Sequence, residues 1–353
     1  MRPRRVTILI DSLIGGGAES VAVEGAAALD GERYVPHLLV TRHTGVLEER
    51  VRESGVAYTI LGRRRGFHPR LFSQAAGIVA GSDLLHAHKF AGSVWGALLA
   101  TRARRPLLAH EHTGDEAASA TRKLLYRSLI APKATRIVCV SDAVADALVR
   151  DGVSRKKLSV VPNGVRTDDI LEPAEARAEL GLPPAGVVVG IVARLRPEKR
   201  HELALAAIRD YRARHGPAVL CIVGDGPLAA DLRARAAALE LGSDVVFAGE
   251  RRDARRLMKA FDALLLTSSY EGMPLAVLEA LVAGVPVVAT DVGGLRELLA
   301  DGGGAVCTGD PAAIADALAE AVVGSRELGE ARRRFGIGRF ADDLQRVYDE
   351  VLA

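Results

Sequence analysis

Residues 262–290, DALLLTSSYEGMPLAVLEALVAGVPVVAT, contain the pattern that predicts the fold. An apolar run ends in hydroxyl side chains, a loop with Glu271 follows, and Pro274 stands where the first turn of a helix is expected. The apolar helical segment after this proline leads directly into a second run, VPVVAT. Two Val- and Leu-rich strands joined through one helix predict a parallel unit whose sheet is covered on both faces.

The same alternation of strand-like and helical segments extends over the whole chain. The strand-like segments form two series. The first comprises RVTILI, PHLLVT, VAYTIL, DLLHAH, LLAHEH, RIVCV and LSVVP, and the second VVVGIVA, AVLCIVG, VVFAG, DALLLTS, VPVVAT and GAVCT. Two such series predict an α/β chain of two Rossmann-like, doubly wound domains. We place the boundary in the turn-rich segment 161–186, which assigns residues 1–166 to one domain and 167–336 to the other.

The composition is that of a soluble globular protein. Of the 353 residues, 49% are hydrophobic and 26% are charged. No apolar run reaches the ~18 residues that a membrane helix needs. The basic start MRPRR is followed by a short apolar run that ends at Asp11, so we expect a strand there rather than a signal peptide. The cysteines Cys139, Cys221 and Cys307 have no paired spacing and are expected to be reduced core residues of a cytoplasmic protein.

The charge is distributed unevenly along the chain. Residues 1–166 carry 25 Lys and Arg against 15 Asp and Glu, whereas the remainder carries 22 against 29. The basic residues of the first part cluster in 63–65, 102–105 and 122–127. Such clusters suit peripheral contact with an anionic membrane, and a solvated Arg-rich surface is the alternative. Nucleic acid is not expected as a partner, because aromatic residues make up only 4% of the chain and no recognition motif occurs.

Ligands of open parallel sheets bind beyond the carboxyl ends of the strands, so residues that follow strands are the candidates for a site. Gly15 and Gly17 follow the first strand and would let a phosphate approach the backbone. A dinucleotide-binding fingerprint is incomplete, because Ser20 stands at its third glycine position, and a purely structural turn is the other interpretation. In the second domain Arg194 and Lys199 follow a strand and suit a diphosphate, with a solvated basic turn as the alternative.

These pieces together form a family pattern. The segments GGGAES, HEHTGD, VCVSDAVADAL, VVPNGV, VARLRPEKR, IVGDGPL and TSSYEGMPLAVLEALVAGVPVVATDVGGLRE occur in this order and span nearly the whole chain. The chain resembles the retaining, nucleotide-sugar-dependent glycosyltransferases of family 4, which have the GT-B fold. The resemblance implies two Rossmann-like domains facing across a cleft, the first for the acceptor and the second for the donor. It also implies that a final helix, at about 337–353, returns to the first domain.

The resemblance assigns roles to individual residues. Arg194 and Lys199 would bind the donor diphosphate, Glu271 the sugar hydroxyls and Glu279 the ribose. The residues expected at the catalytic centre are His112, Glu271, Arg194 and Lys199. The residues expected to bind the donor are Gly16, Gly17, Arg194, Lys199, Glu271, Gly272, Met273, Pro274, Leu275 and Glu279. A UDP-sugar is the expected donor and a GDP-sugar the second choice, with no further cofactor. The alternative for the two glutamates is that one caps the helix and the other stands in it by chance, with no role in binding.

Histidines offer a rival site. His86 with His88, and His110 with His112, alternate along two predicted strands, so four imidazoles could converge as in a zinc site. Since no Cys or carboxylate clearly completes that site and the chain lacks Asp-x-Asp, we expect a mechanism without metal, with His86, His88 and His110 lining the cleft floor. A sugar-nucleotide epimerase and a catalytically silent binding module are the alternative functions. The acceptor stays open among a saccharide, a lipid-linked acceptor and a small molecule.

Overall fold

The computed structural model describes residues 2–64, 68–113, 119–300, 302–323 and 328–353. The chain divides into two compact units. Met1–Val165 and Ile337–Ala353 form the N-terminal unit, and Arg166–Gly336 form the C-terminal unit. This division lies one residue from the boundary placed by sequence, and the final segment belongs to the first unit.

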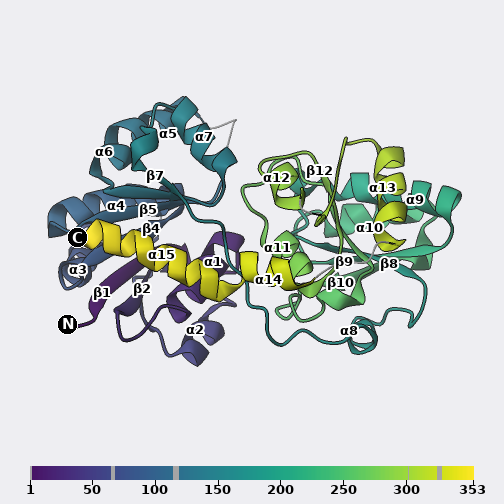
Figure 1. The fold of residues 1–353 in the computed structure, drawn as a ribbon, viewed down its shortest axis with the longest axis horizontal. Coiled ribbons are helices and arrows are strands. Elements are labelled where there is room, and N and C mark those ends of the chain that lie inside the picture. The colour runs from purple at the N-terminus through teal and green to yellow at the C-terminus, as the bar shows by residue number, and fades with distance from the viewer. Residues whose placement is uncertain (1, 65–67, 114–118, 301, 324–327) are drawn as a thin grey trace. The chain divides into compact units, whose positions relative to one another are not determined.

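The N-terminal unit is built on a seven-stranded parallel sheet in the order β3-β2-β1-β4-β5-β6-β7 (Figure 1). Its strands are β1 Arg4–Ser12, β2 Tyr34–His43, β3 Ala57–Ile60, β4 Leu84–His88, β5 Leu107–Glu111, β6 Arg136–Cys139 and β7 Leu158–Val160. Its helices are α1 Gly17–Ala27, α2 Glu48–Ser54, α3 Pro69–Ala80, α4 Lys89–Ala103, α5 Ala120–Leu125, α6 Ala131–Lys133, α7 Asp142–Arg150 and α15 Ile337–Leu352. The seven predicted strands are confirmed. The strand order reverses between β1 and β4, where a ligand is expected.

The C-terminal unit repeats the architecture on a six-stranded parallel sheet in the order β10-β9-β8-β11-β12-β13. Its strands are β8 Val187–Val192, β9 Ala218–Val223, β10 Val245–Gly249, β11 Ala263–Leu266, β12 Val287–Thr290 and β13 Gly304–Cys307. Its helices are α8 Pro173–Glu179, α9 His201–His215, α10 Ala229–Ala238, α11 Leu275–Ala283, α12 Leu295–Leu299, α13 Pro311–Val323 and α14 Leu328–Phe335. The six strand predictions are confirmed, and the order reverses between β8 and β11.

The unit β11-α11-β12 shows why the quoted stretch folds as predicted. Leu265 of β11 pairs in register with Val288 of β12, and both are buried. Helix α11 is apolar on nearly all sides, with Val277 and Leu278 fully buried, which is typical of a helix enclosed in a protein interior. It ends at Gly284, whose φ of 79° is the left-handed conformation that glycine adopts most easily.

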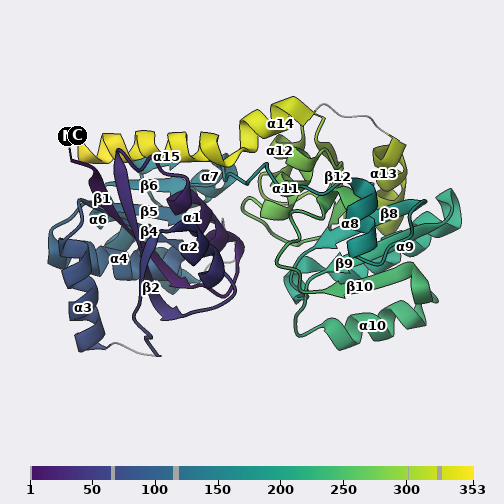
Figure 2. The ribbon, with the colours of Figure 1, turned by 90° about the horizontal axis from the view of Figure 1, so that it is seen from below.

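Helix α15 packs onto the N-terminal unit through an apolar face. Figures 1 and 2 show it in yellow beside the elements of that unit. Phe340 and Tyr348 are buried, and Gly25 of α1 leaves room for the Phe340 ring, since a Cβ there would lie 2.7 Å from it. Tyr34 donates from its hydroxyl to Asp349 at 2.5 Å. The helix is therefore an integral part of the first core.

The structure bears on two further expectations from the sequence, the state of the cysteines and the absence of a membrane helix. Cys139 and Cys221 are buried, Cys307 is half-buried, and all three are free thiols. Within the described residues, no helix combines the length and the apolar character needed to cross a bilayer.

Candidate functional site

An ion pair lies beyond the sheet of the C-terminal unit, where the strand order reverses. Lys199 Nζ donates to Glu271 Oε1 at 2.5 Å, and the two side chains are 23% and 11% exposed. Lys199 follows β8 and Glu271 follows β11, which are neighbouring strands. Because they follow neighbouring strands, these two predicted residues meet although they lie 72 positions apart in the sequence.

Hydroxyl groups at the ends of strands hold this pair in place. Ser268 Oγ donates to Glu271 Oε1 at 2.6 Å, and Thr290 Oγ1 donates to the Ser268 carbonyl oxygen at 2.6 Å. Thr267 Oγ1 donates to the carbonyl oxygen of Lys199 at 2.8 Å. Ser268 and Thr267 are buried, so the loop between β11 and α11 is anchored from inside the sheet.

Gly293, for which the sequence predicts no role, lies against the same loop. Its φ is 57°, and a Cβ on it would lie 2.2 Å from the carbonyl oxygen of Glu271. A side chain at this position would therefore displace the loop that carries the glutamate. The paired glycines of the segment DVGGLRE are visible in the sequence. Only the tertiary structure shows that Gly293 packs against the Glu271 loop.

Helix α11 begins one residue later than predicted. It starts at Leu275, and Pro274 is its N-cap with ψ 125° instead of its first helical residue. Proline suits either place, because it has no N–H to leave unpaired. The first backbone N–H groups of α11 have no intrahelical acceptor and form an anion-binding end. Gly272 and Met273 connect this end to the glutamate loop, and Glu279 is half-buried in the second turn.

The turn after β8 separates the strand from the next helix. A 3₁₀ turn, Pro197–Lys199, follows the strand, and α9 begins only at His201 after Arg200 in a left-handed conformation. Lys199 therefore lies in a tight turn, and Arg194 is half-buried between β8 and that turn. Gly224 holds the neighbouring loop against it, because a Cβ there would lie 2.0 Å from the Ala193 carbonyl oxygen.

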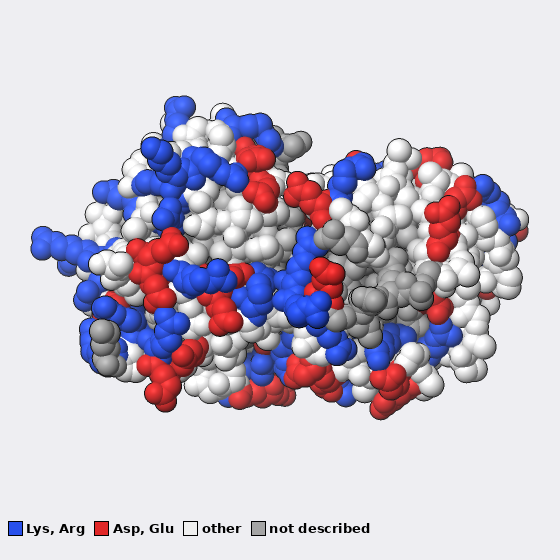
Figure 3. Space-filling model, in the orientation of Figure 1, with Lys and Arg blue, Asp and Glu red and all other residues white. Residues whose placement is uncertain are grey.

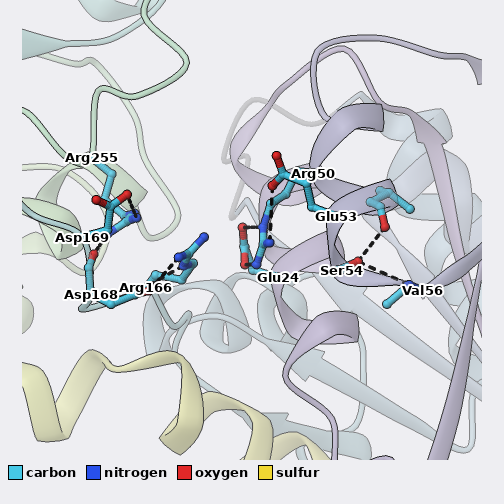
Figure 4. A network of polar contacts seen from close by, with 10 residues as sticks. Glu24, Arg50, Glu53, Ser54, Val56, Arg166, Asp168, Asp169 and Arg255 are labelled. Carbon is cyan, nitrogen blue, oxygen red and sulfur yellow. Dashed lines mark hydrogen bonds and ion pairs between the residues drawn. The ribbon is translucent and has the colours of Figure 1, made fainter.

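Arg255 is a cation near this site that the sequence did not reveal. Its side chain is 16% exposed, lies 4.0 Å from Asp169 and donates to the carbonyl oxygen of Asp168 (Figure 4). Burial and the charge of Arg166 lower the pKa of Arg255, and the charges of Asp168, Glu279 and Asp169 act in the opposite direction. In the sequence it stands among other arginines in ERRDARR, where no spacing distinguishes it from a solvated turn.

In the N-terminal unit the glycine loop leads into α1 as expected. Gly16 is the N-cap and Gly17 the first helical residue, after Gly15 with φ 80°. A Cβ on Gly15 would lie 2.8 Å from Val46, so the loop has no room for a side chain.

A second ion pair lies at the strand reversal of this unit. Glu19 of α1 accepts from Lys89 Nζ at 2.8 Å and is only 6% exposed. Lys89 follows β4 and has φ 65°, a conformation that costs free energy for a residue with a side chain. Strain of this kind is common at functional sites. Glu19 stands in the segment GGGAES, to which the sequence analysis assigned a role only through its glycines, and no quoted motif contains Lys89.

The four histidines converge, but three of them are buried. His86, His88 and His110 are 0%, 2% and 0% exposed, so the expectation that they line a cleft floor is wrong. His86 Nδ1 lies 2.8 Å from the Tyr348 hydroxyl, and its Nε2 lies 3.2 Å from His110 Nδ1. Helix α15 covers them from one side. His112 is half-buried, with Nε2 at 3.0 Å from His88 Nδ1.

The geometry also bears on the zinc alternative. One ring nitrogen from each of His86, His88 and His110 lies within 4.8 Å of the others, which would fit one cation. Both nitrogens of His86, however, already have hydrogen-bond partners in Tyr348 and His110. Metal binding there would have to break those bonds. We therefore describe these histidines as a hydrogen-bonded cluster.

The comparisons with known proteins decide the family. Residues 15–169 match the family described as Glycosyltransferase Family 4, and residues 173–337 match the one described as Glycosyl transferases group 1. A D-inositol 3-phosphate glycosyltransferase of Saccharomonospora viridis is 32% identical over 313 residues, which are 77% of this chain and 70% of that protein. The chain belongs to glycosyltransferase family 4.

Other curated relatives are similar over a shorter part of the chain. The UDP-Gal:alpha-D-GlcNAc-diphosphoundecaprenol alpha-1,3-galactosyltransferase of Escherichia coli is 31% identical over 228 residues, or 60% of this chain. The matched part spans 57%, 58% and 61% of the length of the first three curated relatives. Among solved structures, Anabaena Alr3699/HepE in complex with UDP and glucose superimposes with a TM-score of 0.87 at 23% identity, covering 98% of this chain and 100% of that one. The fold class is thereby confirmed as GT-B, with two Rossmann-like domains.

The basic clusters of this family 4 chain are less available than the sequence suggested. Arg63 is 12% exposed, lies 3.5 Å from Asp11 and packs over the Trp95 ring. Arg122 lies 3.5 Å from the buried Glu111. Arg65 lies outside the described residues. On the face that Figure 3 shows, many Lys and Arg side chains of the N-terminal unit have Asp or Glu beside them.

The buried histidines predict that the N-terminal unit is sensitive to acid. Burial lowers the pKa of His86, His88 and His112 well below 6.5, and that of His110 to about 3. The unfolded chain therefore binds protons below pH 6.5 that the folded chain excludes, and stability is lost as the pH falls. We expect the free energy of unfolding to fall by at least about 2 kcal/mol from pH 7 to pH 5.

Urea unfolding followed by the fluorescence of Trp95 measures this effect in the right unit, because the chain has one tryptophan. Glu111 works in the opposite sense, since burial raises its pKa to about 7 and its contribution is lost as the pH rises through that value. The variant Glu111→Gln should therefore steepen the dependence, and His110→Gln should flatten it. A wild-type stability that is equal at pH 7 and pH 5 would contradict the neutral state of the buried histidines.

Proposed function

We propose that the chain is a retaining glycosyltransferase that moves a sugar from a nucleotide-diphosphate sugar, with a UDP-sugar as the donor, to an acceptor hydroxyl without a metal ion. The observation that carries the proposal is the pair Lys199–Glu271 at 2.5 Å beside the amino end of α11. One cation, one carboxylate and the amino end of a helix suit a diphosphate attached to a polyhydroxylated sugar. The UDP in the Anabaena structure and the UDP-Gal in the name of the E. coli relative support the choice of donor.

Each predicted residue then has a chemical task. Arg194 and Lys199 neutralise the diphosphate, which is the charge that a metal ion would otherwise balance. Gly272, Met273, Pro274 and Leu275 bring the backbone of the α11 start to the same group. Glu279 accepts the ribose hydroxyls, and Glu271 accepts those of the sugar.

The transfer we propose retains the anomeric configuration. The bond from the anomeric carbon to the diphosphate oxygen breaks while the acceptor oxygen bonds to the same face of that carbon. The departing diphosphate takes the acceptor proton, so no protein base is required. Catalysis consists of positioning and of stabilising charge on the leaving group. In the N-terminal unit His112 would contact the donor sugar, and Gly16 and Gly17 would approach the diphosphate and the acceptor.

The acceptor we propose is a saccharide, a lipid-linked acceptor or a small molecule that offers a hydroxyl group. Peripheral membrane contact would rest on the basic residues that stay exposed, such as Arg64, Arg102 and Arg127. Sedimentation with anionic vesicles at low and moderate salt tests this contact, because binding through these residues should fade as salt rises. If the protein does not sediment with such vesicles, the proposed membrane contact is wrong.

A nucleotide panel tests the donor site directly. We expect UDP, as the nucleotide of the proposed donor, to raise the thermal unfolding temperature more than GDP, dTDP or ADP. A ligand at 100 times its Kd stabilises the folded state by about 2.7 kcal/mol. The absence of stabilisation by all four would refute the donor site. Product analysis with a labelled nucleotide sugar then separates transfer from an epimerase, which returns an epimer, and from a silent binding module, which returns the donor unchanged.

Addition of EDTA should leave the rate of transfer unchanged. A large loss of transfer would favour the alternative of a metal site at the histidines.

A further inference from the structure

A buried histidine, His88, lies within hydrogen-bond distance of His112. His88 is 2% exposed at the end of β4, and His112 is half-buried directly after β5. His88 Nδ1 and His112 Nε2 are 3.0 Å apart, with the ring centroids 5.2 Å apart and the planes at 23°. Since one hydrogen atom is shared between these two nitrogens, the state of one ring decides which nitrogen of the other carries hydrogen.

Two arrangements of that hydrogen are available to a pair of neutral rings. If His112 donated from Nε2, His88 would carry its own hydrogen on Nε2, a buried atom without a partner among the described residues. If His88 donates from Nδ1, its Nε2 holds only a lone pair. Buried N–H groups without an acceptor are rarer in proteins than acceptors without a donor, so the second arrangement is favoured.

We propose that His88 is a positioning residue, which holds His112 in the tautomer that carries hydrogen on Nδ1. His112 then presents a neutral N–H donor from Nδ1, while its Nε2 is occupied as an acceptor. This inference rests on the proposed function, in which His112 contacts the donor sugar. A neutral donor suits a sugar hydroxyl or ring oxygen, and it excludes His112 as a cationic acid in the transfer.

The surroundings of the pair support a neutral state. Burial lowers the pKa of both rings, and the neighbouring rings and Lys89 act in the same direction. Lys89 follows His88 in the chain and pairs with Glu19. His86 and His110 form a similar hydrogen-bonded pair in the same buried row, which ends at Tyr348 of α15. His110 of that second pair stacks on His112 with the ring centroids 4.3 Å apart, whereas the hydrogen bond described for His112 is with His88. The second pair therefore provides a control for packing without that hydrogen bond.

The direct test needs no substrate. In the full chain labelled with ¹⁵N-histidine, long-range ¹H–¹⁵N correlation spectra distinguish a protonated ring nitrogen from a bare one, and loss of one signal set in His112→Gln assigns His112. We expect Nδ1 protonated and Nε2 bare at neutral pH. A protonated Nε2 would overturn the proposal. Because this spectrum is independent of transfer, the proposal and the proposed function can fail separately.

The kinetic test compares two substitutions of equal size. His88→Asn keeps an N–H donor near the position of Nδ1, and we expect transfer to stay within roughly 10-fold of the wild type. His88→Asp offers only an acceptor, so it should move the hydrogen to Nε2 of His112 and lower kcat by roughly 10²-fold. It should also add a pH dependence, because a carboxylate favours the charged imidazole.

The same two changes at His86 are the control. His86→Asn and His86→Asp disturb the buried row and its bond to Tyr348. Since His110 stacks on His112 with the ring centroids 4.3 Å apart, the His112 signals should shift, but Nδ1 should stay protonated and Nε2 bare. Thermal unfolding and UDP binding show whether each variant is folded. Equal activity of His88→Asp and His88→Asn, with both folded, would overturn the proposal, as would a move of the His112 hydrogen from Nδ1 to Nε2 in the His86 variants.

Discussion

Replacement of Glu271 by Gln should lower kcat by roughly 10- to 100-fold, because a hydrogen bond to a charged acceptor contributes about 1.5–3 kcal/mol. The isosteric amide keeps the size of the side chain but loses the charge that accepts the sugar hydroxyls. UDP affinity should be unchanged or higher, since UDP lacks the sugar and Lys199 loses the carboxylate that lies 2.5 Å away. Initial-rate kinetics and calorimetric UDP titration of the same preparation measure the two quantities.

Two further variants make this result specific. Glu279→Gln should weaken UDP binding itself, because its proposed contact is the ribose. Glu297→Gln, an exposed carboxylate of α12, should change neither quantity. If Glu271→Gln and Glu279→Gln weakened UDP binding equally, the proposed division between sugar and ribose would be wrong.

Replacement of Lys199 by Gln should have the largest effect, lowering UDP affinity as well as kcat. The change removes a positive charge from the diphosphate, and loss of one preorganised electrostatic contact typically costs about 10²–10³-fold in rate. It also leaves the Glu271 carboxylate, which is 11% exposed, without its cation. Rates with the UDP-sugar and UDP titration again report the two effects.

The double variant Lys199→Gln with Glu271→Gln separates these causes. It should recover stability relative to Lys199→Gln alone, since no unpaired carboxylate remains, but it should not recover UDP affinity. Arg196→Gln is the matched control, because this exposed cation lies three residues away and has no proposed role. A loss of UDP affinity in Arg196→Gln as large as that in Lys199→Gln would mean that net charge, rather than this contact, binds the nucleotide.

The sequence by itself determined the elements and the fold class. Strands such as VVVGIVA are buried on both faces, so their near-continuous apolar runs are visible without any partner. The quoted β-α-β unit was predicted to within one residue at the start of its helix, because an apolar run, a proline and Gly284 act locally. The family motifs likewise lie in short segments, and the residues proposed for the donor could be named from them.

The tertiary structure decided which of these residues meet. Lys199 and Glu271 are brought together by the order β8-β11, and Glu19 and Lys89 by the order β1-β4. Local periodicity carries no information on strand order, since a strand has the same pattern whichever neighbour it pairs with.

Burial of polar residues was equally a matter of tertiary packing. Arg63 belonged to a basic run in the sequence, yet in the structure it lies over Trp95. His86 alternates with His88 along β4, and this pattern predicted a place on a cleft floor, but Tyr348 of α15, 262 positions away, covers it. A side chain's exposure depends on segments that are distant in the chain, which is why composition and spacing could identify these residues but could not place them.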